Sequence, residues 1–232
     1  MVNRQDALDA VTPTQAYSFT AQDHIQHRID EMINSLPDPA HLSPEERRGI
    51  IARYTAVLEP NFIYWMTATF LSVSSREAHD IIEDNLRDEI RNNHPGMLRR
   101  FAVAARSVPT DSDLFVVHRK LQDVRNFVAR LGGIQLILMM AFFEGFIMRF
   151  MPYLAGLASS QGSAEFEYTD VHGVVDITHT QELFRAFLSE GEFPQETLGN
   201  ETPSHTRLFE GVQVLTRLIE TIIRPGAFEF PS

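Results

Sequence analysis

Apolar residues recur every three to four positions along most of the chain, which is the spacing of amphipathic helices. In the first such stretch, Ile25, Ile29 and Ile33 share one side of a helix. The same periodicity, bounded by proline, glycine and serine, predicts helices over 21–36, 44–73, 75–91, 97–108, 111–131, 133–159, 165–188 and 204–223. No strand pair and no internal repeat is indicated. We therefore predict an all-α, single-domain bundle of about seven to eight helices over residues 19–232, after a flexible N-terminal arm over 1–18.

Local signals refine two of these helices. Ser43 is a good N-cap, with Pro44 at the first helical position and acidic residues in the first turn. Pro60 is expected to kink or restart that helix, and Pro152 to kink the long apolar one. The run from Gly133 to Ala158 comes close to membrane-spanning length, but Glu144 and Arg149 interrupt it, which indicates a buried core helix.

Composition excludes several functional classes. The 232 residues carry a formal net charge of −11, and Lys120 is the only lysine, so neither nucleic acid nor an anionic membrane is an expected partner. The absence of cysteine removes disulfides, thiolate metal ligands and cysteine nucleophiles. The first residues lack the apolar core of a signal peptide, and we expect a cytoplasmic protein.

Three potential metal ligands, His172, Asp176 and His179, follow one another at helical spacing. A helix turns about 100° per residue, so positions four and seven along return close to the starting direction. Two imidazoles and a carboxylate on one face suit iron or manganese and can also hold zinc. The alternative is a polar stripe on the surface of an ordinary helix.

The segment that carries these residues is a poor intrinsic helix. Residues 168–180 are rich in β-branched side chains and include Gly173, which costs roughly 1 kcal/mol relative to alanine. Local propensity favours a strand, but strand alternation would place His172 and Asp176 on one face and His179 on the other. Only a helix brings the three together, and we expect it to depend on bound metal for its order.

Further candidate ligands lie on other predicted helices. Glu144 has apolar neighbours for a turn or more on both sides, where a carboxylate is costly to bury unless it binds a metal or pairs with a cation such as Arg149. Glu89 and His94 are five residues apart, about 140° from one another on a straight helix. The break at Asn92–Pro95 would re-aim His94 towards the same cluster.

Together these motifs resemble those of the haem-oxygenase-like di-iron oxidases and oxygenases. The resemblance rests on Asn-Leu-x-x-Glu followed closely by His-Pro, an isolated Glu in an apolar helix, and His-x3-Asp-x2-His, and it spans about Leu86 to Phe187. The six metal ligands that it implies are Glu89, His94, Glu144, His172, Asp176 and His179. One departure is the short interval between Glu89 and His94, where family members often have a longer loop.

The resemblance implies a haem-oxygenase-like bundle that holds two irons, Fe(II) or Fe(III), and no haem, with O2 as co-substrate. We expect an enzyme that acts on a small aliphatic amino acid by C–H abstraction, leading to desaturation, C–C cleavage, cyclisation or N-oxygenation. The resemblance leaves room for an external electron donor and for a homodimer. The apolar shell around Glu144 is a candidate substrate pocket, with plain core packing as the alternative. Its residues are Met140, Phe143, Ile147 and Met148.

Other readings remain open. A di-iron fatty-acid decarboxylase is the nearest rival, and an iron-binding helical scaffold is the non-enzymatic alternative. A true haem oxygenase would use His24 or His27 as an axial ligand and would not need the six ligands. A relative acting on thiamin would need a cysteine nucleophile, which this chain lacks. A cofactorless, quinone-forming relative would leave the three buried-looking acids unexplained.

Overall fold

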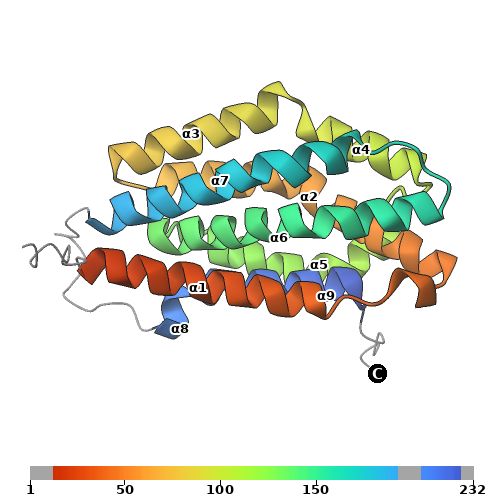
Figure 1. Ribbon diagram of the computed structural model, residues 1–232, viewed down its shortest axis with the longest axis horizontal. Helices are drawn as coiled ribbons and strands as arrows, with labels where there is room; N and C mark the ends of the chain where they lie inside the picture. Colours follow the sequence, from red (N-terminus) through yellow and green to blue (C-terminus); the bar gives the residue numbers. More distant parts are fainter. Residues whose placement is uncertain (1–12, 193–204, 226–232) are drawn as a thin grey trace, which may run out of the picture.

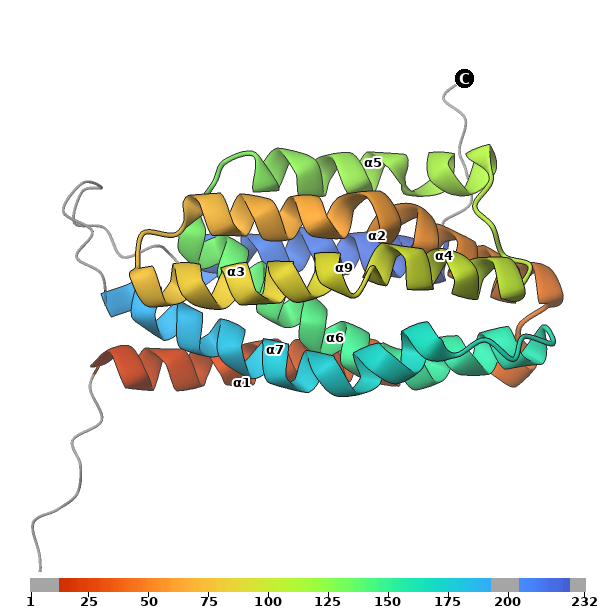
Figure 2. The ribbon, with the colours of Figure 1, turned by 90° about the horizontal axis from the view of Figure 1, so that it is seen from above.

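The computed structural model describes residues 13–192 and 205–225, and these residues form one all-α bundle (Figures 1 and 2). The predicted fold class is thus confirmed. The helices are α1 (Pro13–Asn34), the 3₁₀ turn η1 (Pro39–His41), α2 (Pro44–Ser72), α3 (Arg76–Arg91), α4 (His94–Ala104), α5 (Asp111–Val128), α6 (Gly133–Ser160), α7 (Glu167–Glu192), α8 (His205–Leu208) and α9 (Glu210–Ile223). No strand occurs in the described ranges.

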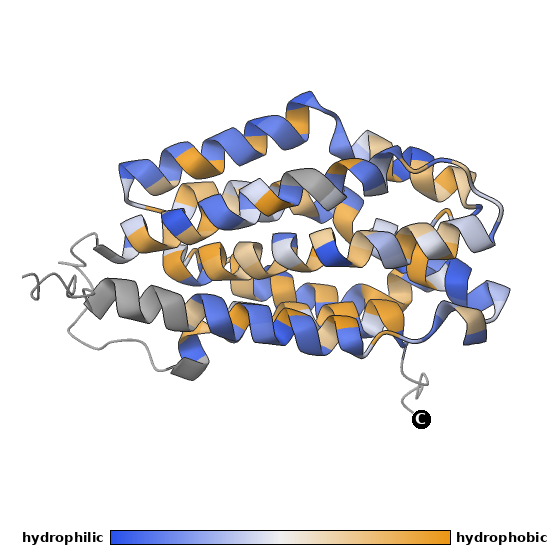
Figure 3. Ribbon diagram, viewed as in Figure 1, coloured by the Kyte–Doolittle hydropathy of each residue, from blue (hydrophilic) through white to orange (hydrophobic). Residues whose placement is uncertain are grey.

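Helix α6 is the centre of the bundle. It contacts α1, α2, α7 and α9, and every residue from Leu136 to Ile147 is buried. Apolar residues recur along α6, whereas α3 is mainly polar (Figure 3). Of the described helices, α6 alone is long and apolar enough to cross a membrane, but its neighbours bury most of it, as expected for the core helix of a soluble protein.

The predicted start of α2 is confirmed by a reciprocal cap. The Ser43 hydroxyl accepts a hydrogen bond from the Glu46 amide (3.2 Å), and the Glu46 carboxylate accepts one from the Ser43 amide (2.7 Å). These two bonds satisfy donors that the first helical turn leaves unpaired. The helix therefore begins where the sequence signals place it.

The two internal prolines do not divide their helices, so of the two expectations for Pro60, a kink or a restart, the restart is excluded. Helix α2 runs through Pro60 and α6 runs through Pro152. A proline inside a helix costs about 3 kcal/mol, so packing on both sides must outweigh that cost. Next to Pro60, the Asn61 side chain donates to the Val57 carbonyl (2.6 Å), which adds a bond beside the missing one.

Several boundaries differ from prediction. Helix α1 begins at Pro13, inside the segment expected to be a flexible arm, because proline fits the first helical position, where its missing N–H leaves no bond unmade. Residues 1–12 and most of the loop predicted over 191–203 lie outside the described residues. Helix α4 starts at His94 rather than at residue 97, which matters for the site below.

Candidate metal centre

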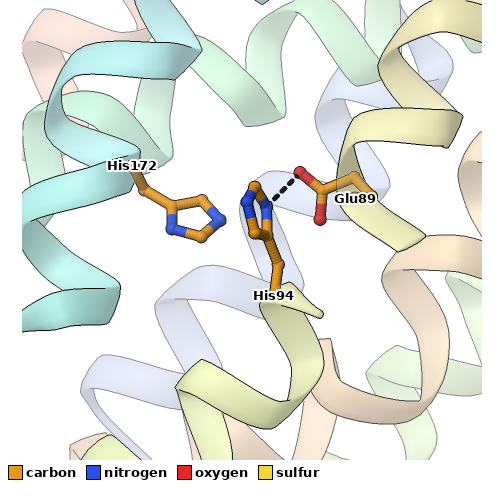
Figure 4. Close-up of side chains that lie close together, drawn as sticks. All are labelled: Glu89, His94 and His172. Atoms are coloured by element: carbon orange, nitrogen blue, oxygen red, sulfur yellow. Dashed lines mark hydrogen bonds and ion pairs between the residues drawn. The ribbon is translucent and has the colours of Figure 1, made fainter. Parts of the chain in front are cut away.

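The structure brings all six predicted ligands together in two groups of three, and each group includes at least one residue from α7. In each group, one potential ligand atom from each residue lies within 4.8 Å of the other two, and none of the six residues is more than 4% exposed. The first triad is Glu89, His94 and His172, from α3, α4 and α7 (Figure 4). The second triad is Glu144, Asp176 and His179, from α6 and α7.

A single backbone conformation turns His94 towards the first triad. Helix α3 ends at Arg91 and α4 begins at His94, and between them Asn93 adopts the left-handed conformation (φ 53°, ψ 46°). Asparagine tolerates this conformation better than most residues. The break therefore removes the misalignment of about 140° that a straight helix would impose between Glu89 and His94.

Hydrogen bonds order the first triad. His94 Nδ1 donates to Glu89 Oε1 (2.8 Å), and His172 Nδ1 donates to the Tyr168 carbonyl (2.8 Å). Because a carbonyl only accepts, the proton of His172 lies on Nδ1, and its Nε2 lone pair is left for a metal. Burial and the nearby His94 lower the pKa of His172 to about 4, so this imidazole is neutral at pH 7.

The second triad has far fewer partners. Both oxygens of Asp176, Oε1 of Glu144 and Nδ1 of His179 are buried without a hydrogen-bond partner. The nearest opposite charges within it are His179 Nδ1 and Glu144 Oε2, 3.7 Å apart. Burial, together with the charges of Glu144 and Glu89, raises the pKa of Asp176 well above its ordinary value.

Within the described part of the chain, histidines are the only basic side chains that pair with the buried carboxylates, His94 with Glu89 and His179 with Glu144. Arg149, the expected alternative partner of Glu144, instead pairs with Asp30 on α1. Among the described residues, neither Glu89, Glu144 nor Asp176 forms an ion pair with arginine or lysine. Buried carboxylates without a countercharge are strongly unfavourable, and a bound cation would remove that penalty.

A tyrosine pair that the sequence did not reveal supports the first triad. The ring of Tyr168 packs against that of His172, with centroids 4.2 Å apart, and its hydroxyl bonds to that of Tyr54 on α2 (2.8 Å). Burial raises the pKa of both tyrosines. Tyr168 lies four residues before His172, so helical spacing could have found it, but no local signal points to Tyr54.

An apolar void lies on the α2, α4 and α6 side of the centre. Its volume is about 20 Å³, room for about one water molecule, and Leu58, Phe62, Leu98 and Ile147 line it together with Glu144 and the first triad. Of the four predicted pocket residues, Ile147 alone reaches this void. Met140 is buried in the core, Phe143 packs edge-on against Trp65, and Met148 is half-buried away from it.

An open groove of about 1000 Å³ lies on the other side, between α3 and α7, and His179 is part of its lining. There, His179 Nε2 is 3.7 Å from a carboxylate oxygen of Asp88, whose side chain is 55% exposed. The sequence did not point to this groove, because exposed charges on a helix are typical of an ordinary solvated face.

The two triads are thus buried oxygen and nitrogen donor sets that could hold metal ions. Another set on α3, His79, Asp80 and Glu83, meets the same distance criterion, but it is partly exposed and lies within one helix. Exposed groups of this kind are common without a metal. Comparison of the chain with protein-family models and with curated proteins found no match.

Proposed function

We propose that this protein is a non-haem di-iron enzyme, similar to the haem-oxygenase-like di-iron oxidases, that uses O2 to oxidise a small aliphatic amino acid. The observation that carries the proposal is the set of five buried donor atoms in the two triads that have no hydrogen-bond partner: His94 Nε2, Glu144 Oε1, both Asp176 oxygens and His179 Nδ1. Orphaned donor atoms that converge from three helices, α4, α6 and α7, are what a metal centre requires.

The chemistry of the donors supports iron. The first triad offers two imidazoles and one carboxylate, and the second offers one imidazole and two carboxylates. Mixed imidazole and carboxylate sets suit iron and manganese better than magnesium or calcium, which prefer oxygen alone. The three carboxylates would neutralise most of the charge of two divalent ions and leave the centre modestly positive. No haem is part of the proposal.

When bound, two irons would supply the activation of O2 and the removal of hydrogen from an unactivated C–H bond. The chain's own residues prepare that site. The Tyr168 carbonyl holds the proton of His172 on Nδ1, which keeps Nε2 available. Apolar side chains such as Leu58, Phe62 and Ile147 keep bulk water from the inner side, which protects a reactive centre from side reactions.

The two rival functions predict different behaviour. A fatty-acid decarboxylase needs an apolar channel for an alkyl chain, but the apolar void has room for about one water molecule and the large groove is charged. This contrast favours an amino acid as substrate. An iron-binding scaffold would bind metal but would not consume O2 in response to a substrate.

A substrate screen tests the proposal. Protein loaded with Fe(II) under anaerobic conditions is mixed with oxygenated buffer and each of the proteinogenic L-amino acids, or with octanoate, decanoate or dodecanoate, while O2 is recorded. We expect one or a few amino acids to accelerate O2 consumption, and His179→Ala protein to abolish the acceleration. Acceleration by fatty acids alone would establish the decarboxylase, and equal rates with and without every compound would establish the scaffold.

A further inference from the structure

A groove between α3 and α7 opens next to the second triad. The two helices run side by side in opposite directions (Figures 1 and 2). Their exposed turns line a groove of about 1000 Å³, which includes His179 of the second triad. A molecule in the groove would therefore lie against the candidate metal centre without passing through the core.

Most charges in the groove are already paired. Arg185 on α7 reaches across to Glu77 on α3 (3.1 Å). Arg76 pairs with Asp80 (3.8 Å), and Arg87 pairs with Asp84 (3.4 Å), each within α3. These pairs are exposed or partly exposed, so they add little to stability but leave those charges engaged.

Three polar groups that line the groove have no partner among the described residues. Arg91 is exposed on α3 and Glu182 is half-buried on α7, and neither forms an ion pair or a side-chain hydrogen bond there. The third group is the Asn85 side chain, which is 1% exposed and whose Nδ2 has no acceptor. A buried donor without an acceptor costs about 1–3 kcal/mol, so a ligand that supplied an oxygen would recover that energy.

We propose that this groove binds the polar end of an α-amino acid, with Arg91 and Asn85 taking the carboxylate and Glu182 taking the ammonium group. The proposal rests on the proposed function, since it assumes that chemistry occurs beside His179. The carboxylate then lies on the α3 wall and the ammonium group on the α7 wall. The aliphatic part is left near the second triad.

Among the described residues, the groove contains one unpaired cation and one unpaired anion, and this pair of opposite charges selects a zwitterionic ligand. A simple carboxylate would pair with Arg91 but would leave Glu182 unpaired and would be repelled by it. A phosphate compound would require an excess of cationic groups, but the groove has acids on both walls. A zwitterion satisfies both unpaired charges at once.

Binding without turnover tests the proposal. Iron-loaded protein kept free of O2 is screened by thermal shift against the proteinogenic L-amino acids. The best binder is then compared, by calorimetry, with its carboxamide, which lacks the carboxylate, and with its deaminated acid, which lacks the ammonium group. We expect the intact amino acid to raise the Tm and each analogue to bind at least about tenfold more weakly, as for the loss of one charge-assisted hydrogen bond.

Substitutions identify which residue binds the carboxylate and which binds the ammonium group of the ligand. Glu182→Gln should weaken the amino acid about tenfold but leave the deaminated acid unchanged, while Arg91→Gln and Asn85→Ala should weaken the amino acid but leave the carboxamide unchanged. Glu45→Gln on α2 and Arg119→Gln on α5, both exposed outside the groove, are matched controls that should change nothing. Losses that do not depend on which end of the ligand is removed would overturn the assignment.

The iron content of the same samples separates this proposal from the proposed function. Two irons per chain without any stabilising amino acid, or with stabilisation by octanoate or decanoate instead, would overturn the groove site and leave the di-iron centre standing. Amino-acid binding with the expected analogue pattern, but without iron or O2 consumption, would support the groove and overturn the proposed function.

Discussion

The two triads are built from the same kinds of side chain but are held in different ways. In the first, Glu89 and His94 bond to one another and His172 bonds to a backbone carbonyl. In the second, Asp176 has no hydrogen-bond partner on either oxygen, and Glu144 and His179 each leave one atom unpaired. The first is ordered by the protein itself, whereas the second has little except packing to hold it.

This difference has an energetic consequence. A preorganised donor set needs little rearrangement to bind a metal. Carboxylates that repel one another are strained until a cation binds between them. We therefore expect the first triad to bind iron more tightly and the second to depend on iron for its geometry. The following predictions test that contrast, from the largest expected effect to the smallest.

Removing Glu144 should have the largest effect. We expect Glu144→Ala to fold but to lose substrate-dependent O2 consumption by more than about 100-fold, because a direct ligand should matter at least as much as the groups that merely orient ligands. Oxygen-electrode assays and circular dichroism measure the two outcomes. Glu45→Ala, which removes an exposed acid on α2 outside both triads and the groove, is the control. Full turnover in Glu144→Ala would show that Glu144 is not a ligand.

Iron binding should be stepwise. Anaerobic titration with Fe(II) should reach two irons per chain, with the second bound at least about tenfold more weakly, a difference of 1.4 kcal/mol. His179→Ala should keep the tight iron, and His94→Ala should lose it. One iron or fewer in the saturated wild type, or two equal affinities, would contradict the contrast between the triads.

Amide hydrogen exchange along α7 should depend on bound iron in the same way. The segment that carries Asp176 and His179 has β-branched residues and Gly173, so its local helix stability is low. We expect exchange across residues 168–182 to slow by about tenfold or more on Fe(II) addition. Exchange along α5 should stay unchanged. Strong protection of 168–182 in metal-free protein would refute the prediction.

The smallest effect concerns stability. The raised pKa of Asp176 means that the folded metal-free protein keeps a proton that the unfolded chain releases above its ordinary value of 3.8. Folding stability therefore falls as pH rises through the raised pKa. We expect Asp176→Asn to stabilise metal-free protein at pH 7 by on the order of 1 kcal/mol, as removing buried charge often does.

Urea unfolding in the presence of a chelator measures that gain, and it should shrink towards pH 4. His172 adds a separate loss below its ordinary value of 6.5, because its pKa in the folded protein is about 4, but this loss is common to both proteins. A variant that is less stable than wild type at pH 7 would show that Asp176 is compensated by groups other than a metal.

Much of the fold and the positions of the six donors were predictable from the sequence, for physical reasons. Helical periodicity records which face is buried, and an acid such as Glu144 in an apolar helix marks a site that needs compensation. The prediction that His172, Asp176 and His179 share a buried face depends only on helical geometry. That these donors hold iron stays a prediction.

What was missed depends on tertiary contacts. The continuity of α2 through Pro60 reflects packing and the Asn61 side chain, which propensity alone cannot weigh. The bond between Tyr54 and Tyr168 joins residues 114 positions apart. The predicted substrate pocket included Met140 and Met148 because of their spacing from Glu144. The structure places Met140 in the close-packed core, and that these residues line a substrate pocket stays a prediction.

The left-handed residue Asn93 has a consequence for how such proteins diverge. The corner between Glu89 and His94 is made by the exposed residues Asn92 and Asn93, so residues added there would extend into solvent and not into the site. Insertions at this corner would lengthen the connection at the surface and leave both side chains where they are, since α4 can begin at the histidine whatever precedes it. Lineages that keep the same site can therefore drift in spacing at this corner, and alignments that reward constant spacing will underestimate their kinship.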